Sequence, residues 1–196
     1  MARPREFDHD TVLDRAMLLF WAKGYHATSL SDLCDTMQLN RSSLYAVFGD
    51  KRTLFLMVID RYGEREAASV FEALSRSVRF GKAVSHFFAE LVDQIVGGRG
   101  RMGCLIGNTA VEVAAHDRAV AASVRRNLDR VEAAFRHALT QAKVRAEIEQ
   151  HIDIGAVARF LVASTQGLRL IGKTTSDREV LEDIVEQIVR ALEYDD

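Results

Sequence analysis

A short segment in the first quarter of the chain has residue types suited to contacting DNA. If residues 41–47 form a helix, Leu44 and Val47 lie three positions apart and face a core. The side chains left outside are those of Arg41, Ser42, Ser43 and Tyr45. An arginine can donate two hydrogen bonds to a guanine edge, small serines let a helix enter the major groove, and a tyrosine can reach a phosphate or a thymine methyl group. These four residues are therefore predicted to face DNA.

Five further residues are expected to contact the DNA backbone or its minor groove. Thr28, Ser29 and Lys51 stand at or near predicted helix N-termini, where free N–H groups and the helix dipole favour phosphate oxygens. Arg3 and Arg5 lie in a charged arm ahead of the first predicted helix and can enter the adjacent minor groove. A solvated charged tail is the alternative for these two arginines.

The rest of the chain has residues suited to binding a small molecule. Large apolar side chains recur there at helical spacing and can line a cavity, and two neutral amides lie on otherwise apolar faces, where each needs a partner. The predicted lining consists of Phe71, Phe87, Phe88, Leu91, Cys104, Asn108, Phe135, Phe160 and Gln166. Packing in an ordinary core is the alternative, because helical spacing does not separate core from pocket.

The thiol of Cys104 is also a candidate switch. It stands near a predicted helix N-terminus, just after Arg99 and Arg101, and such surroundings favour the thiolate that electrophiles and oxidants attack. Its apolar neighbours instead favour burial as inert packing. Cys34 and Cys104 match no metal-ligand or CxxC spacing, and we predict no metal site and no cofactor.

Three short N-terminal helices must position the DNA-contacting residues. Each is marked by a capping residue followed by apolar residues at a 3.6-residue period. The capping residues are Asp8, Ser29 and Asn40, and Gly24 and Gly49 end the first and third helices. Ser29 and Asp32 also have the spacing of a capping box. About three residues separate the second and third helices, which predicts a helix-turn-helix.

A long helix from Asp50 to about Val78 is predicted to join this three-helix domain to a C-terminal helical domain. Further helices are predicted at 82–96, 104–115, 118–144, 152–171 and 177–193, with breaks at Gly81, at 97–100 and at 174–176. The predicted fold class is therefore all-α, with about nine helices. We assign residues 1–52 to a DNA-binding domain and residues 53–196 to a domain for effector binding and dimerisation.

Composition restricts the partners and the location of the protein. The chain has 196 residues, is 48% hydrophobic and contains one proline, which suits a helical protein with a sizeable core. Its net charge is −2, and residues 1–60 contain seven Lys or Arg against eight Asp or Glu, so DNA contact must depend on a local arrangement of cations. No signal segment and no run of about 18 apolar residues is evident, and we expect a soluble cytoplasmic protein.

The stretch AMLLFWAKGYHATSLSDLCDTMQLNRSSLYAVFGDKRTLFLMVIDRY resembles the DNA-binding domain of the TetR/AcrR family of transcriptional regulators. The positions that match the family pattern are Phe20, Gly24, Tyr25, Thr28, Ser29, Leu39, Leu44, Tyr45, Phe48, Lys51 and Leu54. Leu33-Cys34 replaces the family's common Ile-Ala pair, a small departure because cysteine also packs as a small apolar residue. The later segment GCLIGNTAVEVAAHD looks like the C-terminal domain of one subgroup.

The resemblance implies that the last two predicted helices form a four-helix interface in a homodimer. The stripes on these helices include Leu161 and Leu168 on one and Ile184 and Ile188 on the other. A two-fold dimer would set two recognition helices about 34–36 Å apart and would require a near-palindromic operator. The alternative is that the stripes close the domain's own core.

Residues and resemblance together predict a sequence-specific DNA-binding regulator, a repressor rather than an enzyme. A small-molecule effector, or modification of Cys104, would tilt the long helix and release the operator. The alternatives are a helical carrier or enzyme that has kept an unused helix-turn-helix, and a protein-binding scaffold. Against an enzyme, we find no convergent pair of titratable groups beyond the scattered Glu112, His116 and Asp117.

Overall fold

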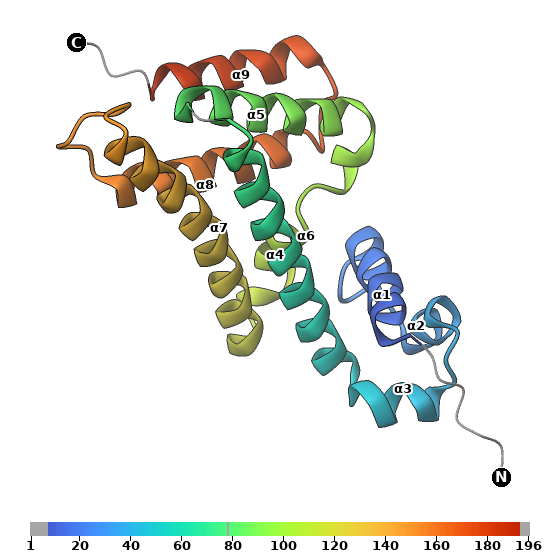
Figure 1. Ribbon diagram of the computed structural model, residues 1–196. Coiled ribbons are helices and arrows are strands. Elements are labelled where there is room, and N and C mark those ends of the chain that lie inside the picture. Colours follow the sequence, from blue (N-terminus) through green and yellow to red (C-terminus); the bar gives the residue numbers. More distant parts are fainter. Residues whose placement is uncertain (1–7, 78, 193–196) are drawn as a thin grey trace.

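The computed structural model describes residues 8–77 and 79–192, and within these ranges the chain is helical and contains no strand (Figure 1). The predicted all-α fold is confirmed. In chain order the elements are α1 (His9–Lys23), α2 (Leu30–Met37), α3 (Arg41–Phe48), α4 (Lys51–Ser75), α5 (Phe80–Val96), the 3₁₀ turn η1 (Arg99–Met102), α6 (Leu105–Thr109), the π-helical turn η2 (Ala110–Ala114), α7 (Arg118–Val144), α8 (Ile154–Ile171) and α9 (Arg178–Arg190).

Side-chain caps start the N-terminal helices where the sequence predicts them. The Ser29 side chain accepts a hydrogen bond from the Asp32 backbone N–H, and the Asp32 carboxylate accepts one from the Ser29 N–H, which completes the capping box. Asn40 caps α3 by accepting from the Ser43 N–H at 2.8 Å. Gly24 ends α1 with a φ of +82°, a conformation that glycine adopts without strain. These local signals set where the helices begin and end, and burial of their apolar faces stabilises them.

Two predicted features of the C-terminal helices are wrong. Gly81 does not interrupt the chain: it lies inside α5, which begins at Phe80, and one glycine costs a helix only about 1 kcal/mol. The helix predicted for 104–115 is not uniform, because α6 passes into the π-helical turn η2 at Ala110. A π turn accommodates one extra residue, and an apolar period alone does not predict it.

The buried apolar residues form two clusters that α4 connects. The first contains α1, α2, α3 and the first half of α4, together with later residues of α6, η2 and α7. The second contains the rest of α4 and α7 with α5, α8 and α9. Figure 1 shows α4 running from α3 at one end of the molecule to α5 near the other. The packing therefore places no boundary at residue 52, and α4 belongs to both clusters.

Helix α8 is apolar but only partly buried. Its 18 residues have a mean hydropathy of 1.2, and 28% of them are buried. By length and composition this helix could cross a membrane, contrary to the expectation from sequence, although helices of soluble proteins pass the same test. An apolar helix with so much exposed surface calls for a covering partner.

Candidate nucleic-acid interface and adjoining pocket

Helix α3 lies at one end of the molecule (Figure 1), and most of its polar residues are exposed to solvent. Leu44 and Phe48 are fully buried in the first cluster and anchor the helix. Arg41, Ser42 and Tyr45 are exposed and Ser43 is half-buried, so the four predicted DNA-facing residues share one accessible surface. The prediction that Val47 faces the core is wrong: it is exposed, because Phe48, four residues after Leu44, takes the inward position.

The turn between α2 and α3 is tight and well bonded. Gln38 has a φ of +56°, in the left-handed region, and the Leu39 N–H donates to the Cys34 carbonyl at 3.0 Å. Leu39 is half-buried against the first cluster. The Ser42 hydroxyl donates to Asn40 Oδ1 at 2.7 Å, so the first turn of α3 is rigid before any ligand arrives.

The residues predicted to contact phosphates have different surroundings. Thr28 is fully buried and its hydroxyl donates to the Gly24 carbonyl at 2.6 Å, so the side chain is not on the surface; this part of the prediction is wrong. Ser29 is exposed at the start of α2. Lys51 is half-buried with Nζ 4.4 Å from the centre of the Tyr25 ring, and burial lowers the pKa of its ammonium. Arg3 and Arg5 lie outside the described residues.

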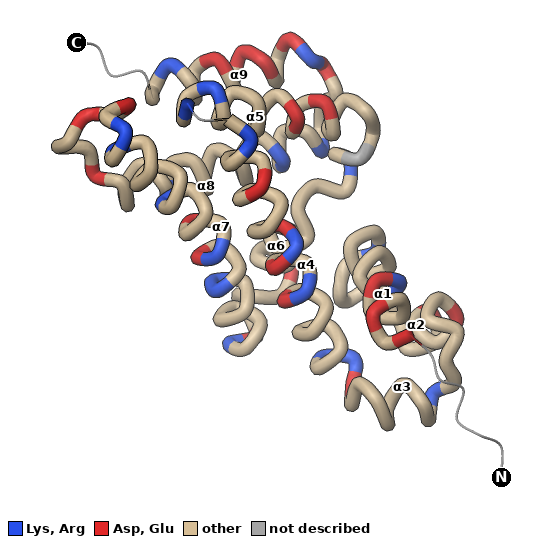
Figure 2. The backbone as a smooth tube through the Cα atoms, in the orientation of Figure 1, with Lys and Arg blue, Asp and Glu red and all other residues tan. Residues whose placement is uncertain are grey.

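Charge around α3 is arranged locally rather than by an excess of cations. The helix contains no acidic residue, and basic residues lie at its start and at the start of α4 (Figure 2). Asp14 on α1 is engaged by Arg61 and Arg65 at 2.6 and 2.8 Å. Desolvation opposes ionisation of Asp14, but these two guanidinium groups outweigh it and lower the pKa of the carboxyl. Such pairing offsets the charge of this carboxylate.

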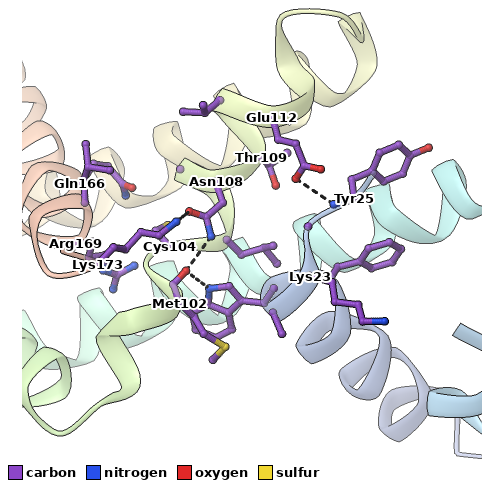
Figure 3. Close-up of a pocket in the computed structure, with 18 of the residues that line it drawn as sticks. Lys23, Tyr25, Met102, Cys104, Asn108, Thr109, Glu112, Gln166, Arg169 and Lys173 are labelled. Carbon is purple, nitrogen blue, oxygen red and sulfur yellow. Dashed lines mark hydrogen bonds between the residues drawn. The ribbon is translucent and has the colours of Figure 1, made fainter. Parts of the chain in front are cut away.

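A cavity of about 710 Å³ lies between the end of α1, the α6–η2 segment and the C-terminal end of α8 (Figure 3). Its apolar wall includes Phe20, Trp21, Phe55, Met102, Leu105 and Leu170, and its polar lining includes Lys23, Arg101, Cys104, Asn108, Thr109, Glu112, Gln166, Arg169 and Lys173. Of the residues predicted to bind an effector, Cys104, Asn108 and Gln166 line this cavity. The structure thus joins three segments that are distant in sequence.

The structure does not bring the other predicted lining residues together in this cavity. Phe87, Phe88, Leu91 and Phe135 are buried in the second cluster, where the Phe87 ring packs edge-on against the rings of Phe88 and Phe135. They fill the core, as the alternative interpretation held. Phe71 and Phe160 are 46% and 41% exposed and lie on the outer surface. Sequence reasoning missed Trp21 and Lys173, because the period of α1 and α8 does not show that both helices border one cavity.

Hydrogen bonds organise the polar side of the cavity. Lys173 Nζ donates to Asn108 Oδ1 at 2.9 Å, and Asn108 Nδ2 donates to the Met102 carbonyl at 2.8 Å. Trp21 Nε1 donates to the same carbonyl at 3.1 Å, so the DNA-contacting unit touches the cavity floor directly. These bonds hold α1, η1 and α8 around one space.

Cys104 occupies the buried end of the cavity. Its side chain is 5% exposed, and Tyr62 Oη lies 3.8 Å from Sγ. Burial, reinforced by the nearby thiol and by Glu66, raises the pKa of Tyr62 well above its usual value. Arg169 pairs with Glu66, and although burial opposes it, this carboxylate raises the pKa of the guanidinium. Cys104 therefore lies in a polar, cation-containing corner rather than in a purely apolar core.

The residues predicted for dimerisation lie mostly inside the chain's own core. Leu161, Leu168 and Ile188 are buried in the second cluster, and Ile184 is half-buried against it. The predicted role in a dimer interface is therefore wrong for the three buried residues, because α8 turns this face toward α7 and α9. The outward apolar residues are Phe160, Leu170 and Ile171 on α8 and Val180 on α9.

A capped helix-turn-helix with a polar recognition helix is the arrangement of a DNA-binding regulator, and the cavity lies against its first helix. Two family models match the chain: "Bacterial regulatory proteins, tetR family" over residues 12–58, and "Tetracyclin repressor-like, C-terminal domain" over residues 82–188. The chain belongs to the TetR family of transcriptional regulators.

Relatives match over almost the whole length. The uncharacterized HTH-type transcriptional regulator YezE of Bacillus subtilis is 36% identical, covering 98% of this chain and 100% of the relative. The HTH-type transcriptional repressor ComR of Escherichia coli is 32% identical, over 96% of this chain and 90% of the relative. A CifR cysteine mutant solved with 26-bp operator DNA is 28% identical, with a TM-score of 0.84 over 97% of this chain and 100% of that one.

Proposed function

We propose that this protein is a repressor that binds its operator as a homodimer and leaves it when a small molecule fills the cavity. The observation that supports this proposal most directly is the position of the cavity. Its wall includes Phe20 and Trp21 of α1, so a bound molecule would touch the DNA-binding unit itself. Binding energy at that wall can favour one position of the unit over another.

The DNA contacts in this proposal come from the start of α3 and its neighbours. Arg41 is the residue placed to bind a guanine edge, and Ser42, Ser43 and Tyr45 supply contacts to bases and phosphates. Ser29 and Lys51 hold the phosphate backbone at helix N-termini. Arg3 and Arg5, ahead of the described residues, extend the contact into the minor groove.

The exposed face of α8 is our candidate for the dimer interface. Phe160 and Ile171 are 41% and 36% exposed on this helix, and Val180 adds an exposed apolar residue on α9. A second copy packed on this face would bury it and would set the two α3 helices for successive major grooves of a near-palindromic operator. A soluble dimer of this kind would act in the cytoplasm, where the DNA is.

The cavity lining suggests what kind of molecule is the effector. Aromatic and aliphatic side chains form one wall, and Asn108, Gln166 and Lys173 gather at another. An effector with an apolar body and a hydrogen-bonding or anionic end fits both. Trp21 is the only tryptophan of the chain, so quenching of its fluorescence would report occupancy.

Modification of Cys104 is a second route to release. An alkylating agent such as iodoacetamide would form an S–C bond with the sulfur while its C–I bond breaks, iodide and the thiol proton passing to solvent, and would leave a bulky group inside the cavity. Iodoacetamide tests this route, because Cys34 and Cys104 are the only cysteines. Release should persist in Cys34→Ser and disappear in Cys104→Ser. Equal release from both variants would exclude the thiol route.

The proposed function is tested first by binding to a labelled fragment of the protein's own promoter, beside an unrelated fragment, at several salt concentrations. We expect about a thousandfold preference for its own fragment, with two or four chains bound. If both fragments bind alike and binding vanishes by physiological salt, the repressor proposal fails for this promoter and a ligand-carrier function is favoured.

A further inference from the structure

Glu112 connects the cavity to the helix-turn-helix. Its side chain comes from the π-helical turn η2, lines the cavity, and reaches the turn that follows α1 (Figure 3). The Tyr25 backbone N–H donates to Oε2 at 3.0 Å and the His26 N–H donates to Oε1 at 2.7 Å. One carboxylate thus binds two consecutive peptide groups from a segment 86 and 87 positions away.

These two hydrogen bonds hold an otherwise weakly bonded turn. Helix α1 ends where the Gly24 N–H donates to the Phe20 carbonyl, and among the described backbone hydrogen bonds none takes up the N–H of Tyr25 or His26. Hydrogen bonds from amides to a carboxylate are shorter and stronger than those between neutral groups. Glu112 therefore ties the backbone of this turn to η2, beside the packing of the Tyr25 ring on Phe55 of α4.

The fit at Gly24 shows how close the two segments are. A Cβ at this position would lie 2.7 Å from Glu112 Oε2, and the φ of +82° disfavours any side chain. Glycine at position 24 therefore serves two purposes, since it ends α1 and admits the carboxylate. Ending the helix requires only the positive φ at position 24, whereas the contact with Glu112 also requires that this position have no side chain.

The turn leads directly into the reading head, by which we mean α2 and α3. Thr28 is fully buried and bonded to Gly24, and Ser29 begins α2. A displacement of residues 24–26 would therefore move α2, and α3 with it. A separate ion pair between Arg52 and Asp117 joins the start of α4 to the start of α7.

We propose that Glu112 is the positioning residue through which the cavity sets the orientation of the reading head. With the cavity empty, its carboxylate holds the turn in the conformation that binds the operator. A molecule that displaces η2, or that supplies its own hydrogen-bond donor to Glu112, would free the turn and release the DNA. This route runs directly from η2 to α1 and does not require α4 to tilt. The inference rests on the proposed function.

The test compares Glu112→Gln and Glu112→Asp with Glu72→Gln, which alters a carboxylate whose side chain is 73% exposed on α4. The glutamine has one acceptor oxygen instead of two, and the aspartate keeps the charge but is one methylene shorter. Operator affinity, the DNA-competent fraction and backbone amide exchange are measured on the full-length dimer.

We expect both Glu112 variants to bind the operator about tenfold more weakly while keeping their dimer content and competent fraction. Amide exchange should accelerate at Tyr25 and His26, and Glu72→Gln should match wild type throughout. Unchanged affinity, or unchanged exchange at these two amides, would overturn the inference. Recovery of wild-type behaviour in Glu112→Asp would also overturn it, by showing that charge alone matters. A wild-type protein that ignores its promoter would instead refute the proposed function, and the inference with it.

Discussion

The side chains on α3 fall into a buried set, which anchors the helix, and an exposed set. Leu44 and Phe48 are buried and hold the helix in place, whereas Arg41 and Tyr45 are exposed and remain available to contact DNA. Substitutions at the second pair should therefore change binding without changing the fold.

We predict that the double variant Arg41→Ala, Tyr45→Ala loses operator binding and keeps its dimer. Each specific base contact is worth about 1–3 kcal/mol, so the two losses together should weaken binding by about thirtyfold or more. Fluorescence anisotropy measures the affinity and size-exclusion chromatography the dimer. Arg125→Ala, at an exposed position on α7, serves as the matched control. A variant that falls apart into monomers would mean that α3 takes part in the dimer interface.

Asp32 gives the reading head a predictable response to acid. The hydrogen bond from Lys23 and the capping-box bonds with Ser29 lower the pKa of Asp32 to about 2. A carboxyl whose pKa is lower in the folded protein than in the unfolded chain stabilises the fold when the pH is above its unfolded pKa. That contribution is lost as the pH falls through the folded pKa. Between about pH 4 and pH 2, the melting temperature of wild type should therefore fall more steeply than that of Asp32→Asn. Parallel curves would show that the carboxylate has no net effect on stability.

The sequence predicts residues that act locally and misplaces those that act at a distance. The Ser29–Asp32 capping box depends on residues three apart, and the structure contains it. Thr28 was expected at the DNA surface, but its burial depends on how the whole turn packs. Glu112 has no local signal at all, because its partners are two backbone amides.

Among the helices, α4 and α7 pack most extensively, and a glycine makes their approach possible. A Cβ at Gly63 would lie 1.7 Å from Asn127 Oδ1. Asn127 is almost fully buried, and its amide donates to the Ser123 carbonyl at 2.9 Å, so it has no room to move.

We predict that Gly63→Ala lowers the free energy of unfolding by about 2 kcal/mol, because the helices must separate or Asn127 must lose its bonds. Gly81→Ala is the control: it lies inside α5 with nothing within 4 Å of the added Cβ, and should stabilise by about 0.5 kcal/mol. Chemical denaturation measures both. Similar effects of the two substitutions would mean that helix propensity, not close packing, governs position 63.

Helix bounds follow from caps and apolar period, and most predicted bounds agree with the structure to within a few residues. The period fails where the helix itself changes, as at η2, and where a glycine is tolerated, as at Gly81. The period also does not show whether an apolar stripe packs in the chain's own core or against a second copy of the chain. That ambiguity is why Leu161 and Leu168 were assigned to an interface they do not reach.

For the whole molecule, the pairing of two copies should depend on the outward face of α8. Phe160→Asp places a charge in the proposed interface and should give monomers. These monomers should bind the operator weakly, since each monomer would contact only one half-site. Val144→Asp, at a position 77% exposed on α7, should remain dimeric. Light scattering gives the mass of each variant. A dimeric Phe160→Asp would place the interface on another face.

The position of the cavity could not be predicted from the sequence. It is made where α1, α6–η2 and α8 meet, and no periodicity within one helix specifies a meeting of three. The aromatic residues chosen from sequence fill the second cluster instead, because large apolar side chains satisfy core and pocket patterns equally.

The first hydrophobic cluster restricts the exchange of DNA-binding domains between such proteins by recombination. Cys104, Leu105, Ile106, Val113, Val120 and Val124 complete the core beneath the reading head. A recombination event that joined residues 1–52 to the remainder of a distant relative would replace all six with side chains shaped for another partner. We therefore expect the DNA-reading segment and its underlying helices to be inherited as one unit. A new operator preference is acquired more readily by substitutions on the exposed face of α3 than by transplanting the domain.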